Sequence, residues 1–128
     1  MEIASDFDAA RAAQERLLDE VASHGFSESA LFAVKLAMEE GLTNAICHGN
    51  RGDAAKKVRL SFDVDDKRAV IVIADEGDGF NPAVLPDPTA DENLDRPCGR
   101  GIMLMRAYMD EVEFNNRGNQ IRLVKRNV

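Results

Sequence analysis

The feature that most constrains the fold is an unbroken apolar run, AVIVIA, at residues 69–74. A strand without polar alternation is typical of the centre of a sheet, so we expect this one to be covered on both faces. Just before it, residues 58–64 alternate between apolar and polar side chains, which predicts a half-buried strand. The short polar segment between them predicts a turn, and short turns between neighbouring strands imply antiparallel pairing.

Two helices are predicted ahead of this hairpin. The first runs from about residue 6 to residue 24, where Gly25 provides a stop signal. The second begins after Ser27, a good N-cap, and continues to residue 47 or 48. Its apolar stripe recurs at helical spacing and comprises Leu31, Val34, Met38, Leu42 and Ala45.

The second half of the chain reads as a long loop, a third helix and two strands. Residues 76–98 contain six acidic residues and four prolines, which predicts a loop. A helix is expected to follow Gly101, and strands are expected at about 111–115 and 119–126. With a short strand at residues 2–4, the order predicts an α+β fold.

This fold is a two-layer α/β sandwich, with a mostly antiparallel mixed sheet covered on one face by helices. The 128 residues fit a single domain, residues 1–128, with one hydrophobic core. A net charge of −7 disfavours nucleic acid as a partner. No apolar run is long enough to span a membrane and no signal peptide is evident, so we expect a cytoplasmic protein with Cys47 and Cys98 reduced.

A carboxylate and an amide share one face of the second helix. Glu40 and Asn44 are four residues apart and lie among small apolar side chains. Such groups are costly to bury without partners, which suggests a cavity beside the helix. By itself the spacing fits a local Glu40–Asn44 polar pair equally well.

A second polar motif ends the central strand. Asp75 is followed by Gly77 and Gly79 in the sequence DEGDG. Glycines let the backbone turn tightly and approach a ligand, and a carboxylate there can accept a hydrogen bond from an exocyclic amine such as that of adenine. In isolation the motif also fits a simple turn.

A third motif opens the third helix, where Arg100 stands between Gly99 and Gly101, followed by Ile102. Free N–H groups at a helix N-terminus favour anions, and Arg100 can add a charge-assisted bond to a phosphate.

These three motifs, in this order, resemble the GHKL (Bergerat-fold) ATP-binding superfamily, the fold of DNA gyrase B, Hsp90, histidine kinases and MutL. The similarity covers nearly the whole chain. Within the superfamily, the segments most like the anti-sigma-factor serine kinases of the RsbW and SpoIIAB type are EEGLTNAICHGN, IADEGDGF, GRGIMLMRAYMDEVEF and GNQIRLVKR.

The resemblance implies ATP and Mg²⁺ as ligands. Asn44 would coordinate Mg²⁺, Asp75 would bind the adenine amine, and Gly77 and Gly79 would lie against the base and ribose. Residues 81–98 would form the ATP lid.

The resemblance also implies a set of phosphate contacts, namely Gly99, Arg100, Gly101 and Ile102. His48 would either reach a phosphate or cap the end of its helix. An N-terminal arginine that touches phosphate and partner would be Arg11 or Arg16, and helix spacing does not choose between them.

Glu40 separates members of the superfamily. Histidine kinases commonly have an amide there, whereas a serine hydroxyl needs a base, an effect typically worth about 10²–10⁴-fold. We therefore expect an ATP–Mg²⁺ serine protein kinase of anti-sigma type. It would phosphorylate a serine on a STAS-type antagonist, sequester a sigma factor, or both.

Two alternatives stay open at this point. One is a non-catalytic ATP-dependent regulatory binding module, and the less favoured one is a detached histidine-kinase catalytic domain. The sequence also leaves the choice between a monomer and a homodimer open.

Overall fold

The computed structural model describes residues 2–49, 56–77, 97–115 and 119–127. For residues 47–49 and 97–102 only the backbone is considered. The first half of the chain contains β1 (Glu2–Ala4), α1 (Phe7–Ser23), α2 (Glu28–Thr43) and a π-helical turn, η1 (Asn44–Gly49). The second half contains β2 (Lys57–Val64), β3 (Arg68–Ala74), α3 (Pro97–Tyr108), β4 (Glu111–Phe114) and β5 (Gln120–Arg126).

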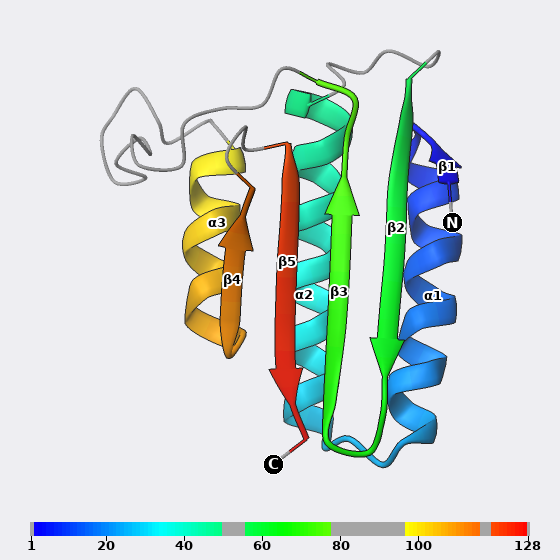
Figure 1. Cartoon of the computed structure of the whole chain (residues 1–128), viewed down its shortest axis with the longest axis vertical. Coiled ribbons are helices and arrows are strands. Elements are labelled where there is room, and N and C mark those ends of the chain that lie inside the picture. The colour runs from blue at the N-terminus through cyan, green and yellow to red at the C-terminus, as the bar shows by residue number, and fades with distance from the viewer. Residues whose placement is uncertain (1, 50–55, 78–96, 116–118, 128) are drawn as a thin grey trace.

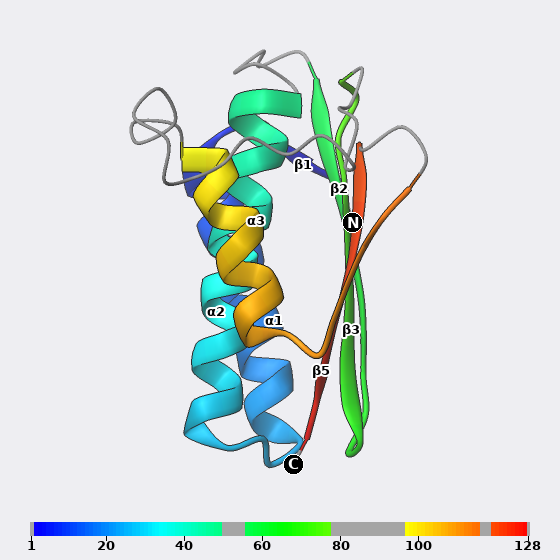
Figure 2. The ribbon, with the colours of Figure 1, turned by 90° about the vertical axis from the view of Figure 1, so that its left-hand side faces the viewer.

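The strands form one sheet in the order β1-β2-β3-β5-β4, with β3 in the middle (Figure 1). Every neighbouring pair in it is antiparallel. The helices of the described residues form a second layer on one side of this sheet (Figure 2). The predicted two-layer α+β sandwich is therefore confirmed, with a sheet that is antiparallel in all its described pairs rather than mixed.

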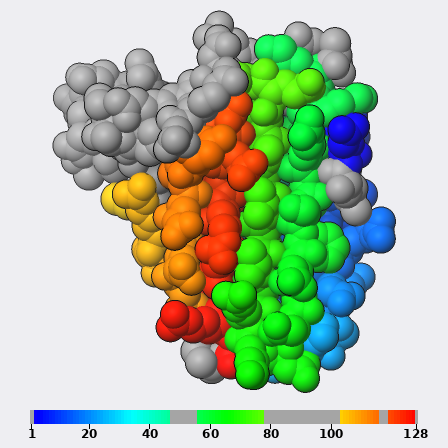
Figure 3. Space-filling view, in the orientation of Figure 1, coloured from blue at the N-terminus to red at the C-terminus, as the bar shows by residue number. Residues whose placement is uncertain are grey.

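The central strand departs from expectation in one respect. Ala69, Ile71 and Ile73 are buried under the helices, but Val70 and Val72 on the opposite face are only partly buried. Figure 3 shows β2, β3, β5 and β4 in view from that side. The prediction that both faces are covered was wrong because helices lie on one side only, so even an unbroken apolar strand keeps one face partly open.

The second helix packs closely on the central strand. Its predicted stripe is buried at Val34, Met38, Leu42 and Ala45, while Leu31 is partly buried. Gly41 makes the close approach possible, since a Cβ there would lie 2.7 Å from Cδ1 of Ile73. The last turn of α2 therefore lies directly over β3, near the strand's end.

Capping residues set the starts of both N-terminal helices, and the predicted N-cap Ser27 is confirmed. The Asp6 side chain accepts a 2.7 Å hydrogen bond from Ala9 N, and Ser27 Oγ accepts one of 3.1 Å from Ala30 N. Gly25, with φ of 79°, adopts the left-handed conformation that ends the first helical segment.

Two helix boundaries differ from the predicted ones. The α-helix of α2 ends at Thr43 and continues as η1, so Asn44 starts a π-helical turn. Helix α3 begins at Pro97, although it was expected to follow Gly101. Proline is favoured at the first helical position because it has no N–H to satisfy, and this signal was overlooked. No described helix is long and apolar enough to cross a membrane.

A histidine joins distant parts of the chain at the end of the molecule away from η1. His24 Nδ1 lies 2.8 Å from Asp66 Oδ1 in the β2–β3 turn, and Nε2 lies 3.5 Å from Glu20 Oε1. Asn127 Nδ2 donates to His24 O at 3.3 Å and to Asp66 O at 2.9 Å. The hydrogen bond to Asp66, supported by Glu20, raises the pKa of His24 above 6.5.

This raised pKa predicts a pH-dependent contribution of His24 to stability. The folded state holds the proton more tightly, so the stabilisation is complete below pH 6.5 and is lost as pH rises through the raised pKa. Urea unfolding of the wild type and His24→Gln should show a difference in unfolding free energy that shrinks with rising pH. A difference independent of pH would contradict the prediction.

Candidate functional site

The three predicted motifs come together at one end of the molecule. Turn η1, the end of β3 and the start of α3 lie at the same end (Figure 1), and η1 contacts α3. The close packing of α2 on β3 fixes the distance between η1 and the end of β3. Residues far apart in sequence therefore meet at the edge where β3 ends and β5 begins.

Asn44 carries a buried polar atom without a partner. Its backbone N–H donates to the carbonyls of Glu40 and Gly41, which keeps the residue in the helix. Its side-chain Oδ1 is buried and accepts no hydrogen bond in the described part of the chain. An unsatisfied buried acceptor costs roughly 1–3 kcal/mol, and an oxygen ligand is what Mg²⁺ prefers. The residue therefore fits the predicted metal ligand.

The described residues offer no carboxylate cage for a metal. No group of three or more His, Cys, Asp or Glu residues among them is arranged to hold an ion. Magnesium commonly takes one or two protein ligands and completes its shell with water and substrate phosphates. A single amide oxygen from Asn44 is compatible with that kind of site.

Glu40 lies one helical turn before Asn44 and is partly buried. Burial raises the pKa of its carboxyl, and the charge of the neighbouring Glu39 raises it further. Among the described residues no hydrogen bond joins the Glu40 and Asn44 side chains, and the Asn44 Oδ1 has no partner there either. The structure gives no support to a simple polar pair and leaves an available carboxylate beside the site.

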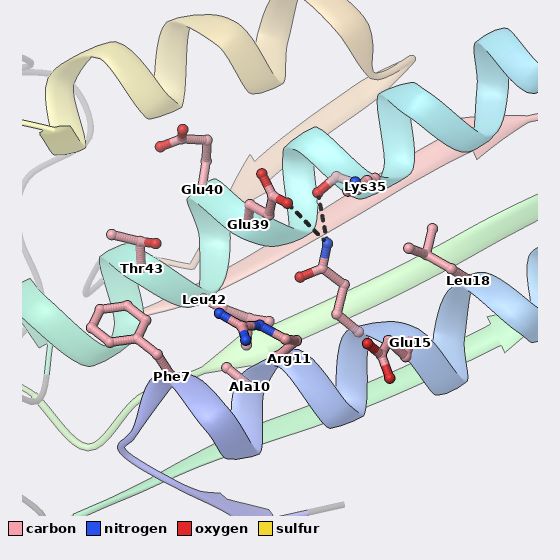
Figure 4. A pocket seen from close by; sticks show the side chains of 11 residues that line it. Phe7, Ala10, Arg11, Glu15, Leu18, Lys35, Glu39, Glu40, Leu42 and Thr43 are labelled. Carbon is pink, nitrogen blue, oxygen red and sulfur yellow. Dashed lines mark hydrogen bonds between the residues drawn. The ribbon is translucent and has the colours of Figure 1, made fainter.

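A groove of about 560 Å³ lies between α1 and α2; Glu40 is one of its lining residues, although its side chain points away from α1 (Figure 4). Its lining residues are Phe7, Ala10, Arg11, Gln14, Glu15, Leu18, Lys35, Glu39, Glu40, Leu42 and Thr43. Of the two arginines left open by the sequence, Arg11 lines this groove and Arg16 does not. Arg11 thus shares a cavity with Glu40.

Sequence reasoning missed Gln14. It is a buried polar residue, 8% exposed, whose Nε2 donates to Lys35 O at 3.4 Å and to Glu39 Oε1 at 3.5 Å. Glu39 is exposed and lines the groove. A signal existed, since Gln14 falls on the buried side of α1 with Ala10, Ala13 and Leu17.

Asp75 follows β3 directly and is half-buried. Its N–H donates to Asn119 O at 2.9 Å, and its Oδ1 accepts from Gly77 N at 2.8 Å. Burial raises the pKa of this carboxyl, and the bond from Gly77 and the charge of Lys56 partly oppose that rise. Asp75 can therefore close the turn and still bind a ligand, because its Oδ2 accepts no hydrogen bond from the described residues.

The remaining predicted contacts are only partly described. Gly79, the His48 side chain, and residues 81–96 of the predicted lid lie outside the description. Gly99, Arg100, Gly101 and Ile102 lie within α3, whose side chains are described only from residue 103. Because α3 starts at Pro97, which has no N–H, the free N–H groups in its first turn are those of Cys98 and Gly99. These are the amides that a helix N-terminus offers to an anion.

Comparison with known proteins defines the class of the chain. Residues 3–125 match the family model of the histidine kinase-like ATPase domain, and the chain belongs to that family. A crystal structure of the RsbU and RsbW domains of Rv1364c from Mycobacterium tuberculosis matches its fold. The TM-score is 0.61 at 16% identity, over 99% of this chain and 31% of that one.

Within the family, the chain is similar to serine-protein kinases named RsbW and to anti-sigma F factors. It is 32% identical over 100 residues to serine-protein kinase RsbW of Bacillus subtilis, covering 72% of this chain and 61% of the relative. RsbW of Oceanobacillus iheyensis is 28% identical over 99 residues, with coverages of 73% and 63%. Anti-sigma F factor of Bacillus thuringiensis is 36% identical over 101 residues, with coverages of 74% and 68%. The match spans less than two thirds of either RsbW relative.

The buried Asn44 oxygen, which has no partner among the described residues, predicts that removing this side chain abolishes the Mg²⁺ response without a loss of stability. Asn44→Ala should leave the unfolding free energy unchanged or raise it by up to about 1 kcal/mol, because a buried unsatisfied group is removed. At the same time, Mg²⁺ should no longer strengthen nucleotide binding. Thermal unfolding and ADP titration with and without Mg²⁺ measure both effects.

Thr43→Ala is the matched control, since it brings a similar gain in helix propensity one residue earlier. It should keep the Mg²⁺ response. A large loss of stability in Asn44→Ala with an intact Mg²⁺ response would contradict a metal role.

Proposed function

We propose that the chain is an ATP–Mg²⁺-dependent serine protein kinase of the anti-sigma type. It would transfer the γ-phosphate of ATP to a serine on a STAS-type antagonist, and it would also bind a sigma factor. The observation that carries the proposal is that two groups lie on adjacent turns of one helix. They are the carboxylate of Glu40 and the side-chain oxygen of Asn44, which has no partner among the described residues. The names of the relatives, serine-protein kinase and anti-sigma F factor, support it.

Glu40 would act as the general base. The serine Oγ attacks the γ-phosphorus, its proton passes to the Glu40 carboxylate, and the bond to the leaving ADP oxygen breaks. A carboxyl with a raised pKa is a stronger base than an exposed one. Magnesium, when bound, neutralises charge on the phosphate oxygens.

The other site residues would bind and orient ATP. Asp75 accepts a hydrogen bond from the adenine amine, with Gly77 and Gly79 beside the base and ribose. The phosphates lie against the start of α3, with Gly99, Arg100, Gly101, Ile102 and His48 as the proposed contacts. Arg11, which shares the groove with Glu40, is the arginine we propose to meet both phosphate and partner.

The proposal predicts that Glu40 is needed for transfer and not for nucleotide binding. Glu40→Gln should reduce phosphoserine formation on a purified STAS-domain antagonist by roughly 10²–10⁴-fold, because the proton acceptor is lost. ADP affinity should stay at the wild-type value. Transfer measured with labelled ATP gives the first quantity, and calorimetric titration gives the second.

Glu15→Gln is the matched control, since it neutralises another carboxylate lining the same groove. It should retain transfer. Wild-type protein that binds ATP yet forms no phosphoserine, with partner binding unchanged in Glu40→Gln, would favour the non-catalytic binding module. Transfer to histidine would favour the detached histidine-kinase domain.

A second prediction concerns the pH dependence of transfer. The charge of Glu39 helps to raise the pKa of Glu40, so Glu39→Gln should lower that pKa. The base must be ionised, so transfer falls as pH drops through this pKa. The acidic limb of the rate profile should therefore lie at lower pH in Glu39→Gln than in the wild type. An acidic limb at the same pH would contradict Glu40 as the titrating group.

A further inference from the structure

Two asparagines flank the connection between the last two strands. Asn115 follows β4 and Asn119 precedes β5. Asn115 Nδ2 donates to Asn119 Oδ1 at 2.7 Å, and Asn115 Oδ1 accepts from the backbone N–H groups of Asn119 and Gln120 at 3.1 and 3.3 Å. Asn115 N also donates to Gln120 O at 3.0 Å. The two side chains thus form a closed set with the local backbone.

Asn119 extends this set to the turn after β3. Its Nδ2 donates to Gly77 O at 3.2 Å, and its backbone carbonyl accepts from Asp75 N at 2.9 Å. One residue therefore holds both ends of the turn, while Asp75 Oδ1 and Gly77 N close it internally at 2.8 Å. All three residues are at least partly buried, so water competes little for these bonds.

Asn115 also fixes which way the Asn119 amide points. An amide group has one acceptor and one donor end, and either can face a given carbonyl until a neighbour selects the orientation. Because Asn115 donates to the oxygen of Asn119, the nitrogen of Asn119 is left to face Gly77 O. The pair therefore acts as one unit.

We propose that Asn119, oriented by Asn115, is a positioning residue that aims the Asp75 carboxylate at the nucleotide base. The inference rests on the proposed function, in which Asp75 binds the adenine amine. Without the Asn119 side chain, Gly77 O loses its partner while the backbone bond from Asp75 N survives. Gly77, whose N–H holds the Asp75 carboxylate at 2.8 Å, is then less firmly placed, so the direction of the carboxylate is less tightly fixed.

If the Asp75 carboxylate is less well directed, recognition of the base should suffer more than affinity for the phosphates. Asn119→Ala should weaken ADP binding by roughly five- to tenfold, the effect of one hydrogen bond. The preference for ADP over GDP should fall by a similar factor, because the carboxylate is the group that distinguishes their exocyclic substituents. The factor by which Mg²⁺ strengthens ADP binding should not change. Asn115→Ala should show the same pattern with a smaller effect.

Asn127→Ala is the matched control. Its side chain is likewise a donor to backbone carbonyls, in this case two, those of Asp66 and His24, at 2.9 and 3.3 Å, at the opposite end of the sheet. It should lower Tm while leaving the affinity and the ADP-over-GDP preference unchanged. Calorimetric titration of each purified variant with ADP and GDP gives both quantities.

Wild-type affinity and base preference in Asn119→Ala would overturn the inference, as would an equal loss in Asn127→Ala. If Asn119→Ala does not fold, Asn115→Ala decides the question by the same two readouts. Failure of the wild type to bind ADP would be a different result, overturning the nucleotide site itself and this inference with it.

Discussion

The structure depends on the close packing of one helix on one strand. Gly41 lets α2 approach β3 so closely that a single added carbon would meet Ile73. Asp75 stands two residues beyond that isoleucine, and Glu40 is the neighbour of that glycine. The contact therefore sets the spacing between the helix that carries Glu40 and Asn44 and the strand end that carries Asp75. The rest of the site is arranged around this spacing.

The polar groups of the site are held in costly environments. The Asn44 oxygen is buried without a partner among the described residues, and burial raises the pKa values of both Glu40 and Asp75. A fold built for stability alone would satisfy or expose such groups. A bound ligand would offset these costs. It would supply a cation to the Asn44 oxygen, a hydrogen-bond donor to the Asp75 carboxylate and a proton to the Glu40 carboxylate. Carboxyls whose pKa is shifted by burial are a recognised mark of functional sites.

Much of this arrangement was readable from the sequence. Apolar spacing predicted α2 and its buried stripe, and the Asp–Gly motif predicted the strand end that carries Asp75. What the sequence could not supply was long-range geometry. The covering of β3 on one face depends on where the helices pack, and the groove between α1 and α2 depends on both. Gln14 and Asn119 escaped notice for the same reason, because their partners are 21 to 42 residues away.

The measurement that tests the account most directly is calorimetric titration of ADP into the wild type and Asp75→Asn. Asparagine keeps an oxygen for the bond from Gly77 N, so the substitution removes the charge and preserves the turn. We expect saturable ADP binding by the wild type, weakened at least roughly tenfold in Asp75→Asn, as for the loss of a hydrogen bond to a charged group. Equal affinity in the two proteins would contradict it.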